Sequence, residues 1–378
     1  MSDLRVCVTL GTRPEGIKLA PIVQKLRQIK EINTHLVLTG QHREMVEQVM
    51  QLFNLQVDEN LEIMQVKQTL SDITCRSLQG LETIFTQIKP QLVIVQGDTT
   101  TAFAASLAAF YQQIAIAHVE AGLRTNDLFN PYPEEANRRL ISQLSQLHFA
   151  PTPAAVKNLQ DSGVTGKIYQ TGNTVIDALL SVAKNNPSCD IPGLNWQDYR
   201  VMLATVHRRE NWGTPLQDII KAFQAILTQY PDTALLLPLH RNPVVRQPLQ
   251  EALGNHPRVF LTDPLDYSQL VGAILRCYFL LTDSGGLQEE APSLGKPVLV
   301  LRETTERPEA IAAGTAKLVG TDSTTILKVA GELLEDQAVY QQMATAINPF
   351  GDGQASTRIV KIIQEYVTHS YTKSKIME

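Results

Sequence analysis

The chain has 378 residues, enough for two domains, and its 43% hydrophobic and 19% charged residues are typical of a globular enzyme. The net charge of −5 argues against the broad basic surface of a nucleic-acid-binding protein, and no apolar run reaches the roughly 18 residues of a membrane helix. Neither nucleic acid nor membrane is therefore an expected partner. The four cysteines show no CxxC spacing, and Cys7 and Cys277 lie in apolar stretches, so we expect these two to be core thiols in a reducing compartment. The first residues lack a signal-peptide core, and the expected location is cytoplasmic.

Short apolar runs alternate with amphipathic segments from the start of the chain. In the first half, the predicted strands are Arg5–Leu10, His35–Thr39, Leu92–Gln96, Ile114–His118, His148–Ala150 and Lys167–Gln170. Segments such as Ile17–Lys30 and Thr100–Tyr111 are the predicted helices between them. In the second half, the predicted strands are Arg200–Thr205, Ala234–Leu239, Arg258–Leu261, Tyr278–Thr282, Pro297–Leu301 and Ala316–Val319. This alternation predicts an α/β protein with doubly wound parallel sheets.

The least patterned stretch, residues 184–199, is rich in Asn, Pro and Gly, and it is the predicted linker. The expected domains are residues 1–183 and 200–350, with residues 351–378 as a final segment. Ligands of doubly wound sheets bind beyond the carboxyl ends of the strands. With two such domains, the cleft between them is the expected site.

The stretch LLTDSGGLQEEAPSLGKPVLVLRETTERPE, residues 280–309, predicts a phosphate site. After Ser284, the pair Gly285 and Gly286 lets backbone N–H groups approach a ligand where a helix begins. An ordinary tight turn capped by Ser or Asp is the alternative. Arg302 and Arg307 follow the next strand at the same sheet edge, which favours a diphosphate.

Two carboxylates, Glu289 and Glu290, occupy the first turn of this helix, beside a site for an anion. A nucleotide carries a ribose next to its phosphates, and acidic side chains accept hydrogen bonds from ribose hydroxyls. Glu290 is therefore the predicted ribose ligand. The alternative is that both charges only favour the helix N-terminus.

Basic side chains follow the first strand of each half. In GTRPEGIK, Pro14 opens a predicted helix and Lys18 lies one turn after it, so Arg13 and Lys18 can face one spot; a solvated basic face is the alternative. His207 in ATVHRREN ends a strand, and we interpret it as a contact for a phosphate or leaving group, although a lone His is more often structural.

Three carboxylates follow strands or begin helices in the first half. Asp98 and Glu120 come after neighbouring apolar runs, and Glu134 lies in NPYPEEANRR. Two carboxylates at adjacent strand ends predict a general acid and base. The alternatives are a helix cap for Asp98, a first-turn charge for Glu134, and a metal site with His118, for which the spacing of a closed zinc site is lacking.

Taken together, GTRPE, QHREM, GDTTT, HVEAGLRT, TGNTVIDAL, HRREN and the stretch at residues 280–309 resemble the non-hydrolysing UDP-N-acetylglucosamine 2-epimerases of bacteria, over nearly the whole chain. The resemblance implies two Rossmann-like domains of the glycosyltransferase-B type, with the final helix packing back on the first domain, and a homodimer. It implies reversible C2 epimerisation by elimination and re-addition of UDP, without a cofactor or metal, to supply N-acetylmannosamine for cell-surface polysaccharide.

The resemblance also implies roles for individual residues. Asp98, Glu120, Glu134 and His207 would be catalytic. The UDP-sugar ligands would be Arg13, Lys18, Asp98, Glu120, His207, Ser284, Gly285, Gly286, Glu290 and Arg307. A second, regulatory substrate molecule would bind Gln41, Glu44, Lys67, Arg208 and His240.

Three other functions share parts of this pattern. A glycosyltransferase of the same architecture would use the same nucleotide site, and a hydrolysing epimerase would release UDP and the free sugar. A nucleotide-sugar sensor would not need the three carboxylates, so their presence favours an enzyme.

Overall fold

The computed structural model describes residues 4–40, 43–65, 67–125 and 127–377 of the chain. The chain forms two compact units, one made of residues 1–178 with 350–378 and the other of residues 179–349. None of the helices within the described ranges is long and apolar enough to cross a membrane.

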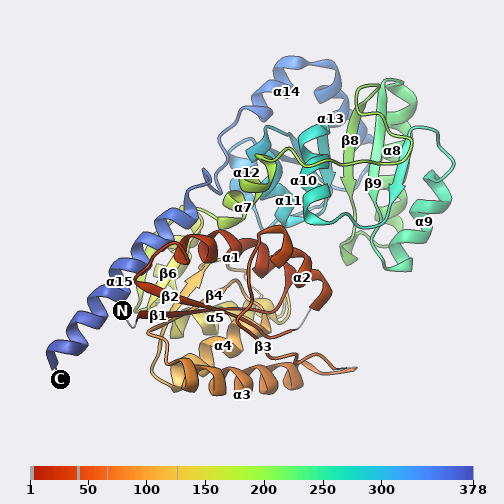
Figure 1. Ribbon diagram of the computed structural model, residues 1–378. Helices are drawn as coiled ribbons and strands as arrows, with labels where there is room; N and C mark the ends of the chain where they lie inside the picture. The colour runs from red at the N-terminus through yellow and green to blue at the C-terminus, as the bar shows by residue number, and fades with distance from the viewer. Residues whose placement is uncertain (1–3, 41–42, 66, 126, 378) are drawn as a thin grey trace. The chain divides into compact units, whose positions relative to one another are not determined.

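The N-terminal unit contains a seven-stranded sheet in the order β3-β2-β1-β4-β5-β6-β7, and every strand pair is parallel (Figure 1). Its strands are β1 (Leu4–Leu10), β2 (Ile32–Leu38), β3 (Glu59–Asn60), β4 (Leu92–Gln96), β5 (Ala115–Val119), β6 (Leu147–Ala150) and β7 (Lys167–Gln170). Its helices are α1 (Arg13–Leu26), α2 (Arg43–Leu52), α3 (Leu70–Ile88), α4 (Thr100–Tyr111), α5 (Glu134–Leu144), α6 (Pro153–Asp161), α7 (Thr174–Ala183), which continues into the second unit, and α15 (Ala355–Met377).

Helices cover both faces of this sheet. In Figure 1, α1, α2 and α15 lie on one side, where α1 packs against both α2 and α15, and α3, α4 and α5 lie on the other. The central strands are mainly apolar on both faces because both faces are covered, and β4 is buried at all five positions. The apolar core on the α3–α4 side includes Cys7, Phe85 and Val93. The predicted burial of Cys7 is confirmed.

The C-terminal unit contains a six-stranded parallel sheet in the order β10-β9-β8-β11-β12-β13. Its strands are β8 (Arg200–Thr205), β9 (Thr233–Pro238), β10 (Val259–Thr262), β11 (Phe279–Thr282), β12 (Val298–Val300) and β13 (Ala316–Leu318). Its helices are α8 (Thr214–Gln229), α9 (Pro243–Leu253), α10 (Tyr267–Arg276), α11 (Gly285–Glu290), α12 (Pro308–Ala312), α13 (Ser323–Glu335) and α14 (Gln337–Ala344), with single 3₁₀ turns η1 (Arg209–Asn211) and η2 (Ala291–Leu294).

Both sheets reverse their strand order beside their first strand, between β1 and β4 and between β8 and β11. The prediction of two doubly wound parallel sheets is therefore confirmed. This reversal separates the two flanking loops and opens a crevice at the carboxyl edge, where such folds bind ligands. The carboxyl ends of β1, β4 and β5 in one unit, and of β8 and β11 in the other, carry most of the predicted site residues.

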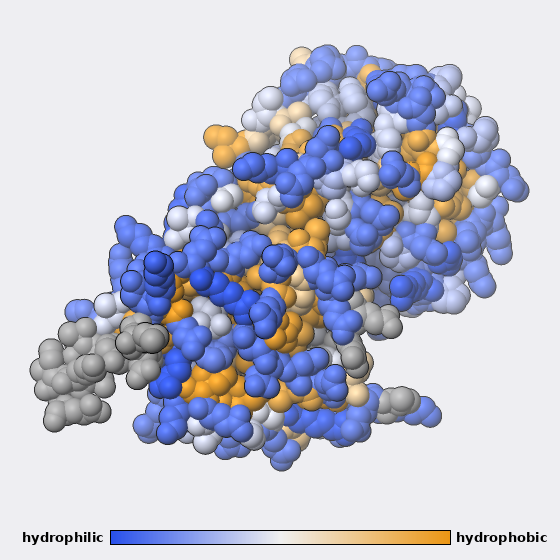
Figure 2. Space-filling model, in the orientation of Figure 1, coloured by the Kyte–Doolittle hydropathy of each residue, from blue (hydrophilic) through white to orange (hydrophobic). Residues whose placement is uncertain are grey.

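Two local features differ from the sequence prediction. Helix α1 begins at Arg13, next to the predicted opening residue Pro14 but four residues before the amphipathic stretch predicted from Ile17, because Thr12 and Glu15 close the helix end ahead of the first apolar position. Strand β3 was not predicted, since its two residues are both exposed. Figure 2 shows that hydrophilic residues cover much of the face in view, with apolar patches between them.

Candidate functional site

Glu120 lies directly beyond β5 and is the most constrained of the three predicted carboxylates. Its backbone has φ +60°, a left-handed conformation that is rare for a residue other than glycine and that clusters at functional sites. Lys18 Nζ donates to its two carboxylate oxygens at 2.7 and 2.6 Å. Asn173 Nδ2 donates to Oε1 at 3.1 Å, and Gln96 Nε2 donates to Oε2. The buried carboxylate is thus fixed by donors from three other elements.

Asp98 lies beyond the neighbouring strand β4 and is partly buried. Its carboxylate pairs with the guanidinium of Arg138, and its backbone carbonyl accepts a hydrogen bond from Asn137 Nδ2 at 2.9 Å. Both partners come from the first half of α5. The alternative that Asp98 caps α4 is wrong, because the N-cap of α4 is Thr99.

Glu134 is the first residue of α5, one turn before Arg138. Its Oε2 is buried and has no hydrogen-bond partner among the described residues. A buried carboxylate oxygen without a donor costs free energy unless a ligand or solvent supplies one. The side chains of Asp98, Glu120 and Glu134 thus come from elements that meet at one sheet edge.

Glu15 is a buried residue beside the candidate site that sequence reasoning missed. Its buried carboxylate accepts hydrogen bonds from the backbone N–H groups of Gly11 (3.0 Å) and Thr12 (2.7 Å), and from the Thr99 hydroxyl (2.6 Å). Burial raises the pKa of Glu15, while these hydrogen bonds oppose the rise. Glu15 therefore joins the loop after β1, which carries Arg13, to the loop after β4, which carries Asp98. The T-x-x-E spacing of Thr12 and Glu15 is a capping-box signal that could have found it.

His118 does not stand in a metal-binding arrangement. Its Nε2 lies 2.7 Å from the Gly97 carbonyl, and burial lowers its pKa to about 3, so the ring is neutral and supports the loop that leads to Asp98. Within the described ranges, no group of three or more His, Cys, Asp or Glu side chains is placed to hold a metal ion.

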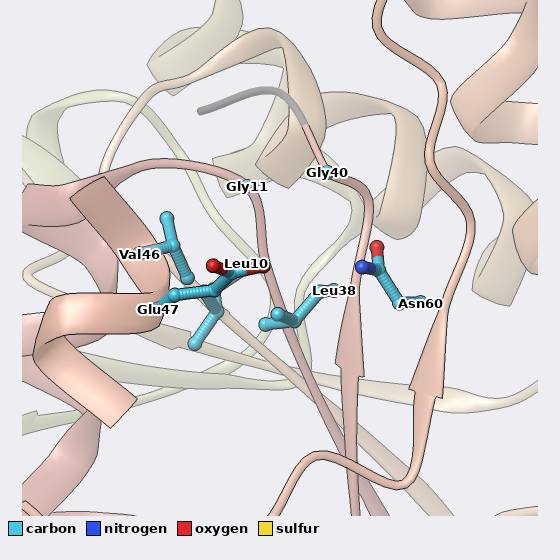
Figure 3. A pocket seen from close by; sticks show the side chains of 7 residues that line it. All are labelled: Leu10, Gly11, Leu38, Gly40, Val46, Glu47 and Asn60. Carbon is cyan, nitrogen blue, oxygen red and sulfur yellow. The ribbon is translucent and has the colours of Figure 1, made fainter. Parts of the chain in front are cut away.

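A small cavity lies at the carboxyl ends of β1 and β2 (Figure 3). Leu10, Gly11, Leu38, Gly40, Val46, Glu47 and Asn60 line it. Its volume of about 10 Å³ is close to that needed for one water molecule. This cavity is too small for a sugar nucleotide, so the carboxylates at the open sheet edge remain the candidate site of this unit.

In the C-terminal unit, His207 follows β8 and meets Asp283, which follows the neighbouring strand β11. Imidazole Nδ1 of His207 lies 2.7 Å from Asp283 Oδ1. Asp283 Oδ2 accepts the backbone N–H groups of His207 and Arg208, each at 2.8 Å, and Nδ2 of Asn211 at 3.0 Å. Burial opposes ionisation of Asp283, yet the hydrogen bond and charge of His207 keep the pKa of this carboxyl below its usual value.

Glu289 and Glu290 have separate partners. The carboxylate of Glu289 is buried and pairs with Nε of Arg307. Glu290 Oε1 accepts a hydrogen bond at 2.7 Å from the hydroxyl of Tyr267, which is also buried. The prediction that both lie in the first turn is wrong, because they are the last two residues of α11. Glu289 orients a cation, and Glu290 is itself oriented.

Arginines gather over the Ser284–Gly286 turn. A Cβ placed on Gly285 would lie 3.8 Å from Nη2 of Arg208 and 3.9 Å from Cζ of Arg307. Arg208 also lies 3.4 Å from Glu306 Oε1, whose other oxygen pairs with Arg302. Arg302 is buried and pairs with Glu210 and Glu306. Arg307 and Arg208 are therefore the cations beside the turn.

The structure describes some, but not all, of the side chains in the predicted regulatory set. His240 stacks on His207 with ring centroids 6.2 Å apart, and Arg208 lies beside Gly285. Lys67 is exposed in the N-terminal unit. Gln41 lies outside the described residues, as does the side chain of Glu44.

The chain is similar to proteins of one known family. A family model described as UDP-N-acetylglucosamine 2-epimerase matches residues 24–364. UDP-N-acetylglucosamine 2-epimerases of Bacillus subtilis and Escherichia coli K12 are each 47% identical, over 96% of this chain and 95% and 98% of their own lengths.

Solved structures agree with these sequence matches. The crystal structure of UDP-GlcNAc 2-epimerase from Neisseria meningitidis bound to UDP-GlcNAc has a TM-score of 0.88 and 45% identity, and covers 96% of this chain and 100% of its own. A structure of S. aureus MnaA with UDP has a TM-score of 0.88 and 43% identity, with 97% of each chain covered. The fold is thus the two-domain, glycosyltransferase-B-like architecture of these enzymes.

Proposed function

Because this chain belongs to the UDP-N-acetylglucosamine 2-epimerase family, we propose that it interconverts UDP-N-acetylglucosamine and UDP-N-acetylmannosamine by inverting C2 of the sugar. The enzyme is an isomerase of the non-hydrolysing kind. The product supplies N-acetylmannosamine for cell-surface polysaccharide.

The observation that carries the proposal is the set of carboxylates beyond β4 and β5. Asp98 and Glu120 follow adjacent parallel strands, and donors from other elements fix each of them. Glu134 stands one helical turn from the arginine that pairs with Asp98, with a buried oxygen that has no donor among the described residues. Positioned carboxylates of this kind serve as general acid and base.

The chemistry requires both a base and a leaving-group site. C2 is not next to a carbonyl, so its proton is difficult to remove directly. A carboxylate takes the C2 proton, the C–H electron pair forms a C1–C2 double bond, and the C1–O electron pair departs with UDP. Re-addition of UDP to C1 and return of a proton to the opposite face of C2 complete the epimerisation. No electron is gained or lost, so the reaction needs no redox cofactor.

The leaving UDP requires stabilisation of its developing negative charge. We assign this role to Arg307, His207 and the backbone of the Ser284–Gly286 turn. Arg13 and Lys18 are the further UDP ligands that we propose from the family resemblance. Glu290, held by Tyr267, is the acceptor for the ribose hydroxyls. This answers why carboxylates stand beside an anion site: Glu289 holds the cation, and Glu290 faces the sugar of the nucleotide.

A second molecule of the substrate is proposed to regulate the enzyme at Gln41, Glu44, Lys67, Arg208 and His240. The positions of Arg208 and His240 beside Gly285 and His207 support this proposal. If it holds, the reverse reaction from pure UDP-N-acetylmannosamine begins with a lag, and added UDP-N-acetylglucosamine abolishes the lag. An immediate linear rate contradicts it.

We also propose a cytoplasmic homodimer. Phe110 and Tyr111 at the end of α4 are 51% and 62% exposed, and this apolar surface suits a subunit contact. The four cysteines are free thiols, which favours a reducing compartment. Light scattering of the purified protein reports the molar mass, and a monomer at micromolar concentration contradicts the dimer.

Product analysis tests the proposed reaction directly. Proton NMR of UDP-N-acetylglucosamine incubated with the enzyme alone is expected to show UDP-N-acetylmannosamine at a constant ratio. Release of UDP with free N-acetylmannosamine would instead identify a hydrolysing epimerase. A substrate that changes only when a sugar acceptor is added would identify a glycosyltransferase.

A further inference from the structure

The buried carboxylate of Asp283 divides its two oxygens between different tasks. Oδ2 accepts three hydrogen bonds, from the backbone N–H groups of His207 and Arg208 and from Asn211 Nδ2. Oδ1 lies 2.7 Å from one other group, Nδ1 of His207. Oδ2 therefore holds the loop after β8, and Oδ1 contacts the imidazole of His207.

Asp283 and His207 differ in their exposure to solvent. Asp283 is fully buried, whereas the His207 side chain is 38% exposed, so the ring joins a buried anion to the accessible edge of the sheet. Nδ1 lies 2.7 Å from a carboxylate oxygen, which can only accept, so this contact is favourable only with a proton on Nδ1, and Nε2 is the nitrogen left for a ligand. A carboxylate beside Nδ1 also balances the positive charge that an imidazole carries when both of its nitrogens hold protons.

We propose that Asp283 is a positioning residue of the epimerase reaction, which fixes the His207 ring with its proton on Nδ1 so that Nε2–H of the cationic ring donates to the departing diphosphate. This inference rests on the proposed function and extends it, since it assigns a role to a side chain that touches no substrate atom. His207 contributes a hydrogen bond and positive charge as the C1–O electron pair moves onto the phosphate oxygen.

The three donors at Oδ2 allow a substitution that moves the proton on the His207 ring without moving the loop after β8. In Asp283→Asn, the single amide oxygen must replace Oδ2, because three donors point at that position. The amide NH₂ then faces Nδ1 of His207. Nδ1 becomes an acceptor, the proton moves to Nε2, and the ring can no longer become a cation without placing two N–H groups against each other.

Two measurements test the proposal on the full-length enzyme. Nitrogen chemical shifts of ¹⁵N-histidine-labelled protein, assigned with a His207→Gln variant, are expected to show a protonated Nδ1 at His207 in the wild type and an unprotonated Nδ1 in Asp283→Asn. A wild-type ring with a bare Nδ1 would overturn the proposal, whether or not the enzyme is an epimerase.

The second measurement is a double-mutant cycle on the epimerisation rate. Asp283→Asn is expected to lower kcat by roughly 10²–10⁴-fold in the wild type, the range of a positioned acid or base, and by less than about threefold in a His207→Gln background. The control is Asn211→Ser, which removes a donor to Oδ2 and should lower kcat by the same factor in both backgrounds. An equal loss for Asp283→Asn in both backgrounds means that Asp283 only holds the loop, and overturns the proposal. If the wild type does not epimerise the substrate, the proposed function fails, and the nitrogen shifts still decide the state of His207.

Discussion

Two neighbouring carboxylates beside the proposed anion site have different partners. Glu289 and Glu290 are consecutive, yet one pairs with Arg307 and the other accepts from Tyr267. A buried carboxylate next to a phosphate would repel it, but a carboxylate paired with an arginine restrains that arginine at little net charge. The identity of each partner therefore decides what each acidic residue contributes.

Arg307 should contribute directly to nucleotide affinity. Arg307→Ala is expected to weaken UDP binding by roughly 1.5–3 kcal/mol, the usual value of a hydrogen bond to a charged group. Isothermal titration calorimetry measures the change. Lys221→Ala, which removes an exposed cation on α8, is the control and should leave the affinity of UDP unaltered. Unchanged affinity in Arg307→Ala would exclude this residue from the diphosphate site.

Asp98 should contribute to the chemical step and not to nucleotide binding. Asp98→Asn retains the shape and an acceptor for Arg138 but removes the basic carboxylate. The turnover rate is expected to fall by roughly 10²–10⁴-fold while UDP affinity stays within about twofold. The matched control is Asp161→Asn at an exposed pair on α6, which should retain full activity. A normal rate in Asp98→Asn would remove it from the catalytic set.

The ionisation of Glu306 makes the folding stability depend on pH. Although burial raises the pKa of Glu306, its hydrogen bond to Arg302 and nearby positive charge lower it to about 2. A carboxyl with a depressed folded-state pKa stabilises the fold above its unfolded pKa, near 4.5, and loses that contribution as pH falls toward 2. The melting temperature of the wild type should therefore exceed that of Glu306→Gln most at neutral pH, and the difference should shrink below about pH 4.5. A difference that does not vary between pH 7 and 3 would contradict this linkage.

At the scale of elements, a buried cap ties the last helix to the first unit. Asp177 on α7 accepts the backbone N–H groups of Ala355 and Ser356 at 3.2 and 2.8 Å, and the Ser356 hydroxyl at 2.5 Å. These groups begin α15, which packs against α1. The chain thus returns to its N-terminal sheet through a side-chain contact that spans 178 positions in sequence.

Removal of this cap should destabilise the N-terminal unit. Asp177→Ala leaves buried donors without an acceptor, and the expected loss is roughly 2 kcal/mol in the free energy of unfolding. Urea denaturation followed by circular dichroism measures it. Asp161→Ala, at an exposed i,i+4 pair, should alter the stability by less than about 0.5 kcal/mol. Equal stabilities of the two variants would show that α15 is held by apolar packing alone.

Elements with continuous apolar sequences could be predicted well, and elements defined by a few polar contacts could not. Strand β4 and helix α4 have the predicted bounds, because their apolar residues make the periodicity unambiguous. Strand β3 has two exposed residues whose only signal is their pairing with Val37 and Leu38. The start of α1 depends on Thr12 and Glu15, so the apolar pattern alone places it too late.

At the scale of the whole molecule, the predicted site residues of each unit lie near one another because parallel strands end at a common sheet edge. Sequence could place Asp98 and Glu120 at adjacent strand ends, but it could not show which residue meets His207. His207 and Asp283 are 76 positions apart and meet only because β8 and β11 adjoin where the strand order reverses. The pairing of Glu289 with Arg307 likewise requires the positions of β11 and β12, which the local pattern does not contain.

The fate of the C2 hydrogen tests the account most directly. Elimination and re-addition require that the C2 proton leave the sugar, and a carboxylate exchanges its proton with solvent. UDP-N-acetylglucosamine incubated with the enzyme in heavy water should therefore give UDP-N-acetylmannosamine with deuterium at C2, seen as loss of the H2 signal in proton NMR and a mass increase of about one unit. Slow appearance of UDP and an unsaturated sugar should accompany it. Epimerised product that retains its original hydrogen at C2, with no unsaturated sugar at any time, would contradict the elimination mechanism.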